Sequence, residues 1–477
     1  MENIILQIVI EYAKIILGYH EKFGLHDLSE MAEELKRISG GMALEILRAF
    51  IEAADKAICE AKGERRGDGV RIRESSVPRE LFTALGEFKY SRTYFDTPHG
   101  REYILDGMLG VEAYERVDRG VSAALVNAAA SNSYGRSAEI VTGGKVSRQS
   151  ARNKAINTGE VAYVPERSAN APVALHIFAD EDHVSLQDGK GAILPLVTVC
   201  EGKRPVCEGR NELIEPFHVH GYGQDPEDLW GYVYALCEKK YDMGLVKEIY
   251  IYGDGAPWIQ KAFEVFPYAV HVLDGFHYKK RMKSLLAGDI CRAYSQPLHG
   301  AVARGDKALF DKTVQKMLGE VEAEMAPGKE KDGRVKNIAE NNAYFQAHWG
   351  AVMNMKLEGS IGSCTEAMVS HVLSQRFSRS PMGWSKEGLS KMAMIRVYVC
   401  NGGKVEPADT TAWKRKSDKN SVIAKYDKYE ALVKEQQDKI LKGAKNWRWF
   451  EAENLISGKL TGTKAALDAL GQTRKIS

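Results

Sequence analysis

The stretch that most constrains the fold lies near the middle of the chain, at residues 247–283. Two β-rich runs, Glu248–Tyr252 and Tyr268–Leu273, are each followed within two residues by an aspartate, Asp254 and Asp274, and then by a helical pattern. A strand–helix–strand–helix order predicts parallel strands with helices packed on the faces of the sheet. We therefore expect both aspartates just beyond the carboxyl ends of buried strands, where open α/β sheets bind their ligands.

These acidic positions also have a simpler interpretation. Gly253 and Gly255 flank Asp254, so this residue alone is explained as a turn residue and helix cap. Two such aspartates in successive units, the second followed closely by His277 and a basic cluster, favour a polar site over a pair of caps.

The composition is that of an ordinary soluble globular protein. The 477 residues predict two to four domains, and hydrophobic and charged residues make up 44% and 27% of them. No run approaches the ~18 consecutive apolar residues that a membrane helix needs. The seven cysteines form no CxxC pair, which predicts reduced thiols in the cytoplasm. Because the net charge is only +2, any nucleic-acid surface must come from local basic patches.

The N-terminal part of the chain is predicted to be mainly helical. Residues 1–85 form a helical region in which the segment GERRGDG, 63–69, is a loop. Residues 86–165 are predicted to form a second region. It begins with a β-hairpin whose strands, 87–95 and 101–105, flank the turn sequence DTPHG.

A helix-turn-helix-like pattern follows this hairpin. Helices are predicted at 137–142 and 147–156, with Gly143 and Gly144 at the turn. The second helix carries side chains that can bond base edges or phosphates: Arg148, Gln149, Arg152, Asn153 and Lys154. We therefore expect the region 86–165 to bind DNA. A helical hairpin with a solvated basic face explains the same residues equally well.

Residues 166–286 predict the first part of an α/β core. Three predicted strands precede a helix and the central stretch: 172–186, 191–202 and 215–223. Three antiparallel strands followed by parallel α/β units are the layout of the ribonuclease H-like fold, which has a mixed five-stranded sheet. Asp180 then lies on the first strand and Asp254 after the fourth.

A helical segment is expected to interrupt this core. Residues 287–357 are charged and poor in strand signals, which predicts an all-helical insertion. Residues 358–400 return to the core with a helix that carries Glu366. Residues 401–477 are predicted to be a polar, helical tail.

Three acids of the predicted core suit phosphoryl transfer on a nucleic acid. That reaction needs an oxygen nucleophile activated in place and negative charge neutralised on the phosphate, and two Mg²⁺ ions ~3.5–4 Å apart do both. Mg²⁺ needs few carboxylates because it keeps several waters. Two strand-end aspartates and one helical glutamate, Asp180, Asp254 and Glu366, are therefore candidate metal ligands and catalytic residues. Mn²⁺ is expected to substitute for Mg²⁺.

Four motifs occur in a fixed order: ADEDHVSLQ, GDGAPWI, FP-x-A-x-x-VLDGFH and SHVLSQRFSRSPMGWSKEG. Together they resemble the transposases of the ISLre-type bacterial insertion sequences, over roughly residues 81–400. That DDE family was long catalogued as an uncharacterised protein family and is distantly similar to Mutator-type transposases. The resemblance implies Mg²⁺-dependent DNA cleavage and strand transfer. Its implied partners are the element's terminal inverted repeats and target DNA, bound by a homo-oligomer in the bacterial cytoplasm at the nucleoid, with no membrane partner.

The same resemblance ranks the neighbouring candidates. The relatives carry an Asp or Cys three residues before a His, soon after the second catalytic Asp, and Asp274 and His277 match that pattern. The related pattern also places a Val four residues after the first catalytic Asp. This favours Asp180 over Asp182 because Val184 lies four residues after Asp180. Asp182, Asp274 and His277 are thus expected to support the metal ligands or to replace one of them.

Two assignments stay open at this level. Glu366 is predicted to share one helix face with Val369 and Leu373, at offsets of three and seven, and so to point with the side that packs on the sheet. The run from Ser363 to Glu366 is also a capping-box pattern, in which the glutamate only bonds the helix start. A basic run after His277 is predicted to contact DNA phosphates, with a solvated helix face as a close alternative: Lys279, Lys280 and Arg281.

Two other functions fit part of the pattern. The run FADED supplies a D-x-D after a strand and GDG recurs, as in haloacid-dehalogenase-like phosphatases, which hydrolyse small phosphate esters without DNA. Against this, GDGAPW lacks the further acid expected after GDG in that superfamily. A DNA-binding regulator with an inactive nuclease fold would bind a defined site without cutting it, although all three acidic positions are filled.

Overall fold

The computed structural model describes residues 2–208, 210–380, 382–410 and 428–435. Internal packing divides the described residues into two compact units, one made of residues 2–121 with 428–435 and the other of the described residues from 122 to 410. Most of the predicted tail, 401–477, lies outside the described residues. In the described part of the chain, no helix is both long enough and apolar enough to cross a membrane.

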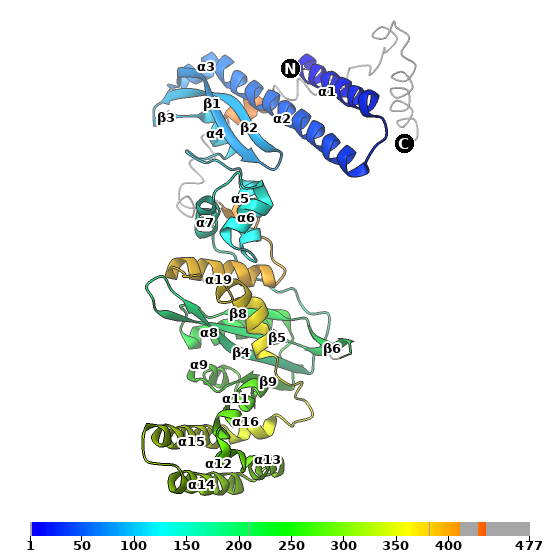
Figure 1. Cartoon of the computed structure of the whole chain (residues 1–477). Coiled ribbons are helices and arrows are strands. Elements are labelled where there is room, and N and C mark those ends of the chain that lie inside the picture. The colour runs from blue at the N-terminus through cyan, green and yellow to red at the C-terminus, as the bar shows by residue number, and fades with distance from the viewer. Residues whose placement is uncertain (1, 209, 381, 411–427, 436–477) are drawn as a thin grey trace. The chain divides into compact units, whose positions relative to one another are not determined.

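The first unit combines two long helices with a three-stranded antiparallel sheet (Figure 1). Its elements are α1 (Glu2–Phe23), α2 (Leu28–Glu60), α3 (Lys62–Gly67), β1 (Arg71–Thr83), β2 (Gly86–Thr97), β3 (Gly100–Glu102) and α4 (Ile104–Leu109). Helix α2 begins after Asp27, whose carboxylate accepts the amide hydrogens of Ser29 and Glu30. Ile58 of α2 packs with Phe95 of the sheet in the buried core of this unit.

The sheet of the first unit differs from the predicted hairpin. β2 and β3 pair as expected, but the main partner of β2 is β1, which lies within the region predicted to be helical. Most residues of β1 are exposed, several are charged, and the sequence of the strand contains Pro78. The segment therefore lacks the apolar alternation that indicates a strand. Residues 63–69, predicted to be a loop, fall mostly within α3, and residues 104–109 form α4 instead of ending a strand.

Three helices open the second unit: α5 (Arg119–Ala129), α6 (Tyr134–Thr142) and α7 (Arg148–Asn157). The hydroxyl of Ser147 caps α7 by accepting the amide hydrogen of Ser150. Gly143 and Gly144 have φ of 57° and 79°, left-handed values that favour glycine, so the turn between α6 and α7 is tight. The two helices predicted here are confirmed. The division between the units falls at Val121, inside the region 86–165.

A mixed five-stranded sheet forms the centre of the second unit (Figure 1). Its strands are β4 (Ala174–Ser185), β5 (Gly191–Cys200), β8 (Phe217–His220), β9 (Glu248–Gly253) and β10 (Val270–Leu273). Their order in the sheet is β10-β9-β4-β5-β8. β5 runs antiparallel to β4 and β8, whereas β4, β9 and β10 run parallel. The predicted sheet, with three antiparallel strands followed by two parallel ones, is confirmed.

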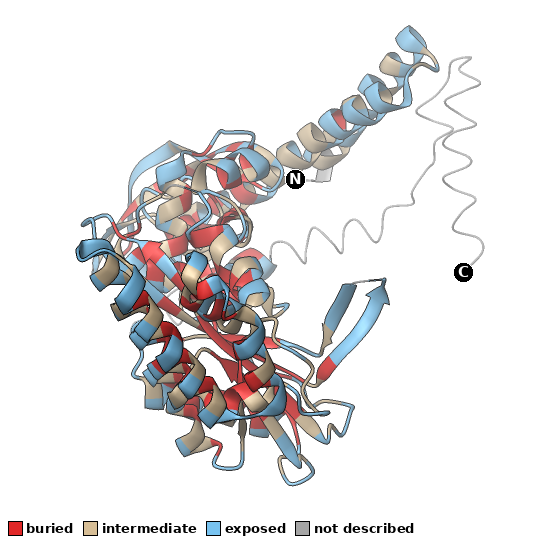
Figure 2. Ribbon diagram, turned by 60° about the horizontal axis from the view of Figure 1, so that its bottom comes forward, coloured by how far each residue is buried: buried red, intermediate tan, exposed pale blue. Residues whose placement is uncertain are grey.

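A hairpin absent from the sequence-based prediction follows β5. Its strands, β6 (Gly202–Cys207) and β7 (Arg210–Ile214), pair with each other. Figure 2 shows most of this hairpin exposed, whereas the strands of the central sheet are largely buried. Of its described residues, only Leu213 of β7 packs against a core cluster, so the hairpin sequence carries no regular apolar alternation.

Helices cover both faces of the central sheet. On one face, Ile177 of β4 packs with α8 (Pro226–Lys240), α9 (Pro257–Gln260) and α10 (Ala262–Val265). On the other face, Val184 of β4 packs with residues 365–377 and α19 (Lys386–Cys400). Ile177 and Val184 are an odd number of positions apart, so they point to opposite faces.

The predicted helix that carries Glu366 is short and irregular. It consists of α17 (Thr365–Met368), a π-helical turn η1 (Val369–Ser374) and α18 (Gln375–Phe377), and a short 3₁₀ turn, η2 (Pro407–Thr410), follows later. Arg396 of α19 supports the π turn because its guanidinium donates to the carbonyl oxygens of His371 and Val372, at 2.7 and 2.8 Å. Such turns are frequent at functional sites.

The segment between the two parts of the core is helical, as predicted. It contains α12 (Asp289–Arg292), α13 (Ser295–Arg304), α14 (Lys307–Glu324), α15 (Lys329–Ala347) and α16 (Trp349–Asn354). Phe310, Phe345 and Trp349 form its core, which Met282 of α11 (Gly275–Leu285) joins. α16 packs against β10, so this insertion is fixed to the strand that leads into Asp274.

Candidate active site

Asp180 lies in the middle of β4, on the face covered by residues 365–377. Strand alternation places it on the same face as the buried Val184. Asp180 is 9% exposed and accepts the amide hydrogen of Glu181 at 2.9 Å. Burial, together with the negative charges of Asp274 and Asp254, raises the pKa of Asp180 to about 6. This carboxyl group is therefore poorly neutralised by the protein itself.

Asp254 follows the last residue of β9. The parallel register of β4 and β9, continued by two residues, places Asp254 level with Asp180 on strands ~4.8 Å apart. Asp254 Oδ1 accepts the amide hydrogen of Ala256 at 2.8 Å, as the simpler interpretation of a turn residue requires. Its Oδ2 lies 3.7 Å from His277 Nδ1. The turn role thus uses one oxygen and leaves the other facing the imidazole.

The turn around Asp254 depends on its two glycines. Gly255 has a φ of 84°, and a side chain there would overlap the ring of His348. At Gly253 a Cβ atom would lie 3.1 Å from a carbonyl oxygen of β4, closer than side chains normally pack. The turn is therefore pressed against the strand that carries Asp180.

Asp274 has a structural role in this arrangement. It caps α11, and its Oδ1 accepts the amide hydrogens of Phe276 and His277 at 2.7 and 3.1 Å. Its Oδ2 accepts hydrogen bonds from the hydroxyls of Ser363 and Thr365. Asp274 is only 2% exposed, so it holds the segment before α17 against the sheet and has little capacity left for a ligand.

Asp182 is also engaged by the protein. Its Oδ1 accepts the hydroxyl of Ser378 at 2.9 Å, and Ser374 also bonds this carboxylate. Its Oδ2 is buried and has no partner among the described residues. Burial raises the pKa of Asp182. Glu181, which precedes Asp182 in β4, points to the opposite face, where it accepts the indole hydrogen of Trp258 at 2.6 Å.

Glu366 lies in the first turn of α17, but its side chain is exposed. The prediction that it shares the buried face with Val369 and Leu373 is wrong. The buried stripe begins at Thr365, and the next residue of a helix is turned by ~100° from it. The capping box is absent as well, because the Ser363 hydroxyl bonds elsewhere and the Glu366 carboxylate makes no hydrogen bond within the described part of the chain.

Two residues of the helical insertion reach this site without any signal in the sequence. Tyr344 Oη donates to the carbonyl oxygen of Asp254 at 2.7 Å. The ring of His348 lies against Gly255. Burial lowers the pKa of His348 and outweighs the nearby Asp254 carboxylate, which raises it. Tyr344 and Asp254 are 90 positions apart, too far for a local motif to connect them.

Helix α7, which is predicted to contact DNA bases, exposes some of its polar side chains to solvent. Ala151 and Ala155 are buried and fix its inner face. Gln149 Nε2 donates to Asn153 Oδ1 at 2.8 Å, so these two amides lie side by side. Of the five predicted contact residues, three are exposed: Arg148, Gln149 and Asn153. The other two, Arg152 and Lys154, are half-buried.

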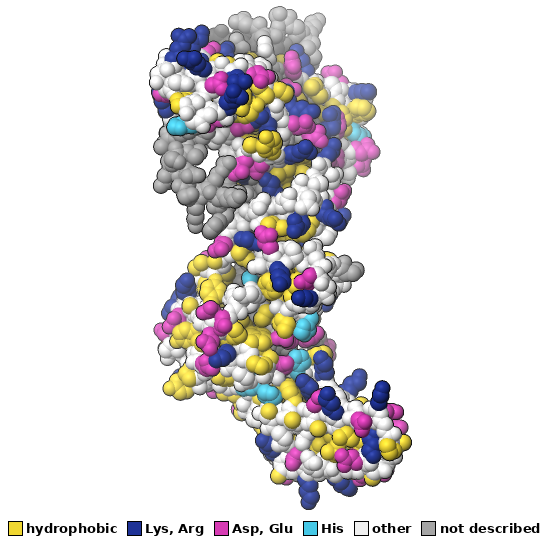
Figure 3. All heavy atoms as spheres, turned by 90° about the vertical axis from the view of Figure 1, so that its left-hand side faces the viewer, with side chains coloured by type: hydrophobic (Ala, Val, Ile, Leu, Met, Phe, Trp, Pro, Cys, Tyr) yellow, Lys and Arg dark blue, Asp and Glu magenta, His cyan; other side chains and the backbone are white. Residues whose placement is uncertain are grey.

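The basic residues after His277 lie on α11, which starts at the Asp274 cap. Lys279, Lys280 and Arg281 are all exposed. The Arg281 guanidinium also lies 4.5 Å from the ring centroid of Tyr344. On the face drawn in Figure 3, lysine and arginine side chains are mixed with acidic ones, as expected from the net charge of +2. The structure thus brings this basic run close to the acidic site, while α7 lies elsewhere in the unit.

The acidic site is a carboxylate pair. In the described ranges, no group of three or more His, Cys, Asp or Glu side chains is arranged to hold a metal ion. Asp180 and Asp254 nevertheless suit Mg²⁺, which binds one or two protein carboxylates and keeps water or phosphate oxygens in its other positions. The raised pKa of Asp180 fits the same chemistry, because a cation between two like charges removes their repulsion.

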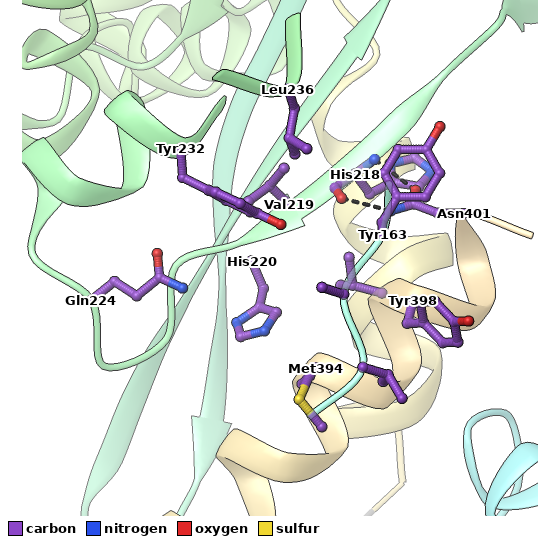
Figure 4. Close-up of a pocket in the computed structure, with 13 residues that line it drawn as sticks. Tyr163, His218, Val219, His220, Gln224, Tyr232, Leu236, Met394, Tyr398 and Asn401 are labelled. Atoms are coloured by element: carbon purple, nitrogen blue, oxygen red, sulfur yellow. Dashed lines mark hydrogen bonds between the residues drawn. The ribbon is translucent and has the colours of Figure 1, made fainter. Parts of the chain in front are cut away.

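A separate cavity lies beside β8 at the other edge of the sheet (Figure 4). Its volume is about 200 Å³, and His220, Gln224, Tyr232 and Met394 contribute to its wall. Burial lowers the pKa of His220 to about 4, so its imidazole is neutral at pH 7. None of the predicted site residues lines this cavity, which is therefore distinct from the carboxylate pair.

Comparison with known proteins identifies the family but not an activity. A sequence profile of the uncharacterised protein family UPF0236 matches residues 22–416. One UPF0236 protein of Caldanaerobacter subterraneus subsp. tengcongensis is 32% identical over 476 residues, which are 98% of this chain and 97% of the relative. A second from the same organism is 32% identical over 448 residues, 93% of each chain. A third is 31% identical over 478 residues, 98% of this chain and 97% of the relative. The chain therefore belongs to the UPF0236 family.

Proposed function

We propose that this protein is a DNA transposase of the DDE type. It binds the ends of an insertion sequence and catalyses Mg²⁺-dependent strand cleavage and strand transfer, as the resemblance to ISLre-type transposases implies. The observation that carries the proposal is the pair Asp180 and Asp254, one on β4 and the other directly after β9, its parallel neighbour in a mixed five-stranded sheet.

The topology of the sheet supports this proposal. The order β10-β9-β4-β5-β8, with one antiparallel and one parallel half, is the order expected of a ribonuclease H-like fold. In that arrangement the first acid lies on the central strand and the second at the end of its parallel neighbour. Asp180 and Asp254 occupy these two positions.

The proposed roles follow from the contacts of each acid. Asp180 and Asp254 would hold the metal, and the ion would supply both activation of the attacking oxygen and neutralisation of charge on the phosphate. Glu366 is the proposed third ligand, since its carboxylate makes no hydrogen bond within the described residues and α17 packs beside β4. Asp274 and Asp182 hold the surrounding segments, and His277 faces Asp254.

Basic side chains supply the proposed DNA contacts. Lys279, Lys280 and Arg281 lie on α11 close to the acids and would bind phosphates of the strand to be cut. The exposed polar residues of α7 would read the sequence of the element's end. As part of the same proposal, the protein acts as a homo-oligomer on DNA, at the nucleoid.

The names of the relatives also support a mobile element. The name of the first relative joins eleven locus designations of one organism, and that of the third joins four. Many loci for one protein in a single genome are what a transposing element leaves behind.

The phosphatase alternative fits the structure less well. It needs both acids of the D-x-D motif free at the end of a strand. Asp180 and Asp182 instead lie within β4, and Asp182 is bonded to the hydroxyl of Ser378.

The test uses the full-length protein and linear DNA that carries the sequences flanking its gene. We expect binding to the flanking ends, with affinity falling steeply as salt rises, and strand cleavage in Mg²⁺ but not in EDTA. End binding without cleavage in Mg²⁺ or Mn²⁺ would instead indicate a regulator. Hydrolysis of p-nitrophenyl phosphate without any action on DNA would indicate a phosphatase.

A further inference from the structure

Tyr344 connects the helical insertion to the acidic site. It lies on α15, and its hydroxyl donates to the main-chain carbonyl oxygen of Asp254 at 2.7 Å. That carbonyl belongs to the turn between Gly253 and Gly255, where φ of Gly255 is 84° and residues 254–256 lie outside helices and strands. The hydroxyl of Tyr344 therefore restrains the turn that aims the Asp254 carboxylate.

The ring of the same tyrosine holds a basic residue. The Arg281 guanidinium lies 4.5 Å from the centroid of the Tyr344 ring, a cation–π distance. Arg281 is exposed and belongs to the basic run of α11. Tyr344 thus contacts both the turn that carries Asp254, a proposed metal ligand, and Arg281, which is proposed to bind a DNA phosphate.

His348 supports the turn from the same helix end. Its ring lies 4.8 Å from the ring of Tyr344 and fills the space beside Gly255, where any side chain would overlap it. It also packs edge-on against His271 of β10 at 5.9 Å. Tyr344 and His348 are four positions apart, so they present one helix face to the site.

The insertion is built to hold this face still. Phe345, the next residue after Tyr344, is completely buried and packs on Phe310, which in turn packs on Trp349. Burial raises the pKa of Tyr344, and the nearby Asp254 raises it further. The phenol is therefore protonated at pH 7, as its hydrogen bond to the Asp254 carbonyl oxygen requires.

We propose that Tyr344 is a positioning residue through which the helical insertion fixes both Asp254 and Arg281. The hydroxyl sets the position of the metal-binding turn, and the ring sets the position of a guanidinium that binds a DNA phosphate. This inference rests on the proposed transposase function, and it gives the insertion a role in the reaction beyond its own folding.

Two substitutions separate the two contacts. Tyr344→Phe removes the hydroxyl and keeps the ring, whereas Tyr344→Leu removes both. The matched control is Tyr294→Phe in the same insertion, where the lost hydroxyl bonds Glu320 and not the Asp254 turn. Each full-length variant is measured for Mn²⁺ binding by electron paramagnetic resonance, for affinity to end DNA in EDTA, for cleavage rate against Mg²⁺ concentration, and for melting temperature.

The positioning role predicts a different pattern for each variant. Tyr344→Phe should bind Mn²⁺ about three- to tenfold more weakly and need correspondingly more Mg²⁺ for cleavage, with DNA affinity unchanged, since one neutral hydrogen bond is lost. Tyr344→Leu should in addition bind end DNA about threefold more weakly at low salt. Tyr294→Phe should match wild type in metal and DNA binding.

Two results would overturn the inference. One is a Tyr344→Phe protein with wild-type Mn²⁺ binding and Mg²⁺ dependence. The other is equal effects of Tyr344→Phe and Tyr294→Phe, which would indicate a general loss of stability. A wild-type protein that neither binds Mn²⁺ nor cleaves DNA would refute the proposed function itself, which is a separate outcome.

Discussion

At the scale of single residues, the two buried aspartates of β4 differ in what surrounds them. Both point to the face covered by residues 365–377, two positions apart. Asp182 accepts hydroxyls from Ser374 and Ser378, whereas Asp180 accepts one local amide hydrogen and faces two other acids. The sequence motif favours Asp180 as the first ligand. Its pKa stays raised despite the nearby His277, which is consistent with that choice.

Asp180 should make the metal-free protein less stable as the pH rises. Its pKa is about 6 in the folded protein against an ordinary value of 3.8, so between these values the folded state binds more protons than the unfolded chain. Stability therefore falls across this window, by at most about 3 kcal/mol, and stays lower above it. We expect Asp180→Asn in EDTA to melt above wild type at pH 8 and close to it at pH 4.

The matched control for this prediction is Asp289→Asn, because the Asp289 side chain is 97% exposed. It should follow the wild-type melting curve at both pH values. A difference between Asp180→Asn and wild type that does not grow from pH 4 to pH 8 would contradict the raised pKa.

At the scale of elements, the sequence predicts those segments that bury one regular face. The strands of the central sheet and the helices α6 and α7 follow from apolar periodicity and caps. β1 and the β6–β7 hairpin are mostly exposed and carry no such pattern. The π turn η1 depends on hydrogen bonds from Arg396 of another helix, so local sequence cannot indicate it.

Glu366→Gln tests the element that carries the third proposed ligand. Because the glutamate is exposed and forms no capping bond in the described structure, the substitution should leave the melting temperature nearly unchanged. Loss of a charged metal ligand should still reduce strand cleavage by about 100-fold or more. The measurements are thermal melting and cleavage of end DNA in Mg²⁺.

The control for Glu366 is Glu387→Gln, another exposed glutamate in the first turn of a helix, α19. It should cut like wild type. If Glu366→Gln is equally active, the third carboxylate lies elsewhere. The next candidate is then Glu358, which is exposed in the turn that follows α16.

At the scale of the whole molecule, chain order is a poor guide to which parts belong together. The sequence predicts one DNA-binding region at residues 86–165, but its hairpin and its helices α6 and α7 belong to different compact units. The contact between Tyr344 and Asp254 joins residues 90 positions apart across the insertion. The pair Asp180 and Asp254 could be predicted from the sequence. Asp180 lies in one predicted strand and Asp254 follows another, and the topology of the predicted sheet makes these two strands neighbours.

DNA recognition belongs to this scale because it is proposed to use both α7 and α11. Arg148→Ala, at an exposed position of α7, should lower affinity for the element's end and reduce the preference for end over random DNA by about 1–3 kcal/mol. Competition binding with both DNAs at several salt concentrations measures this. Arg210→Ala, exposed on β7, is the control and should keep the preference. Equal wild-type affinity for both DNAs would refute a sequence-reading role for α7.

The central claim is that Asp254 holds the metal that cuts DNA. The most direct measurement compares Mg²⁺-dependent cleavage of end DNA by wild type, Asp254→Asn and the exposed control Asp289→Asn, with end binding measured in parallel. Asp254→Asn keeps an oxygen to accept the amide hydrogen of Ala256 but loses the negative charge. We expect it to bind the ends like wild type and to lose cleavage by about 100-fold or more, while Asp289→Asn cuts normally. Cleavage by Asp254→Asn at close to the wild-type rate would contradict the account.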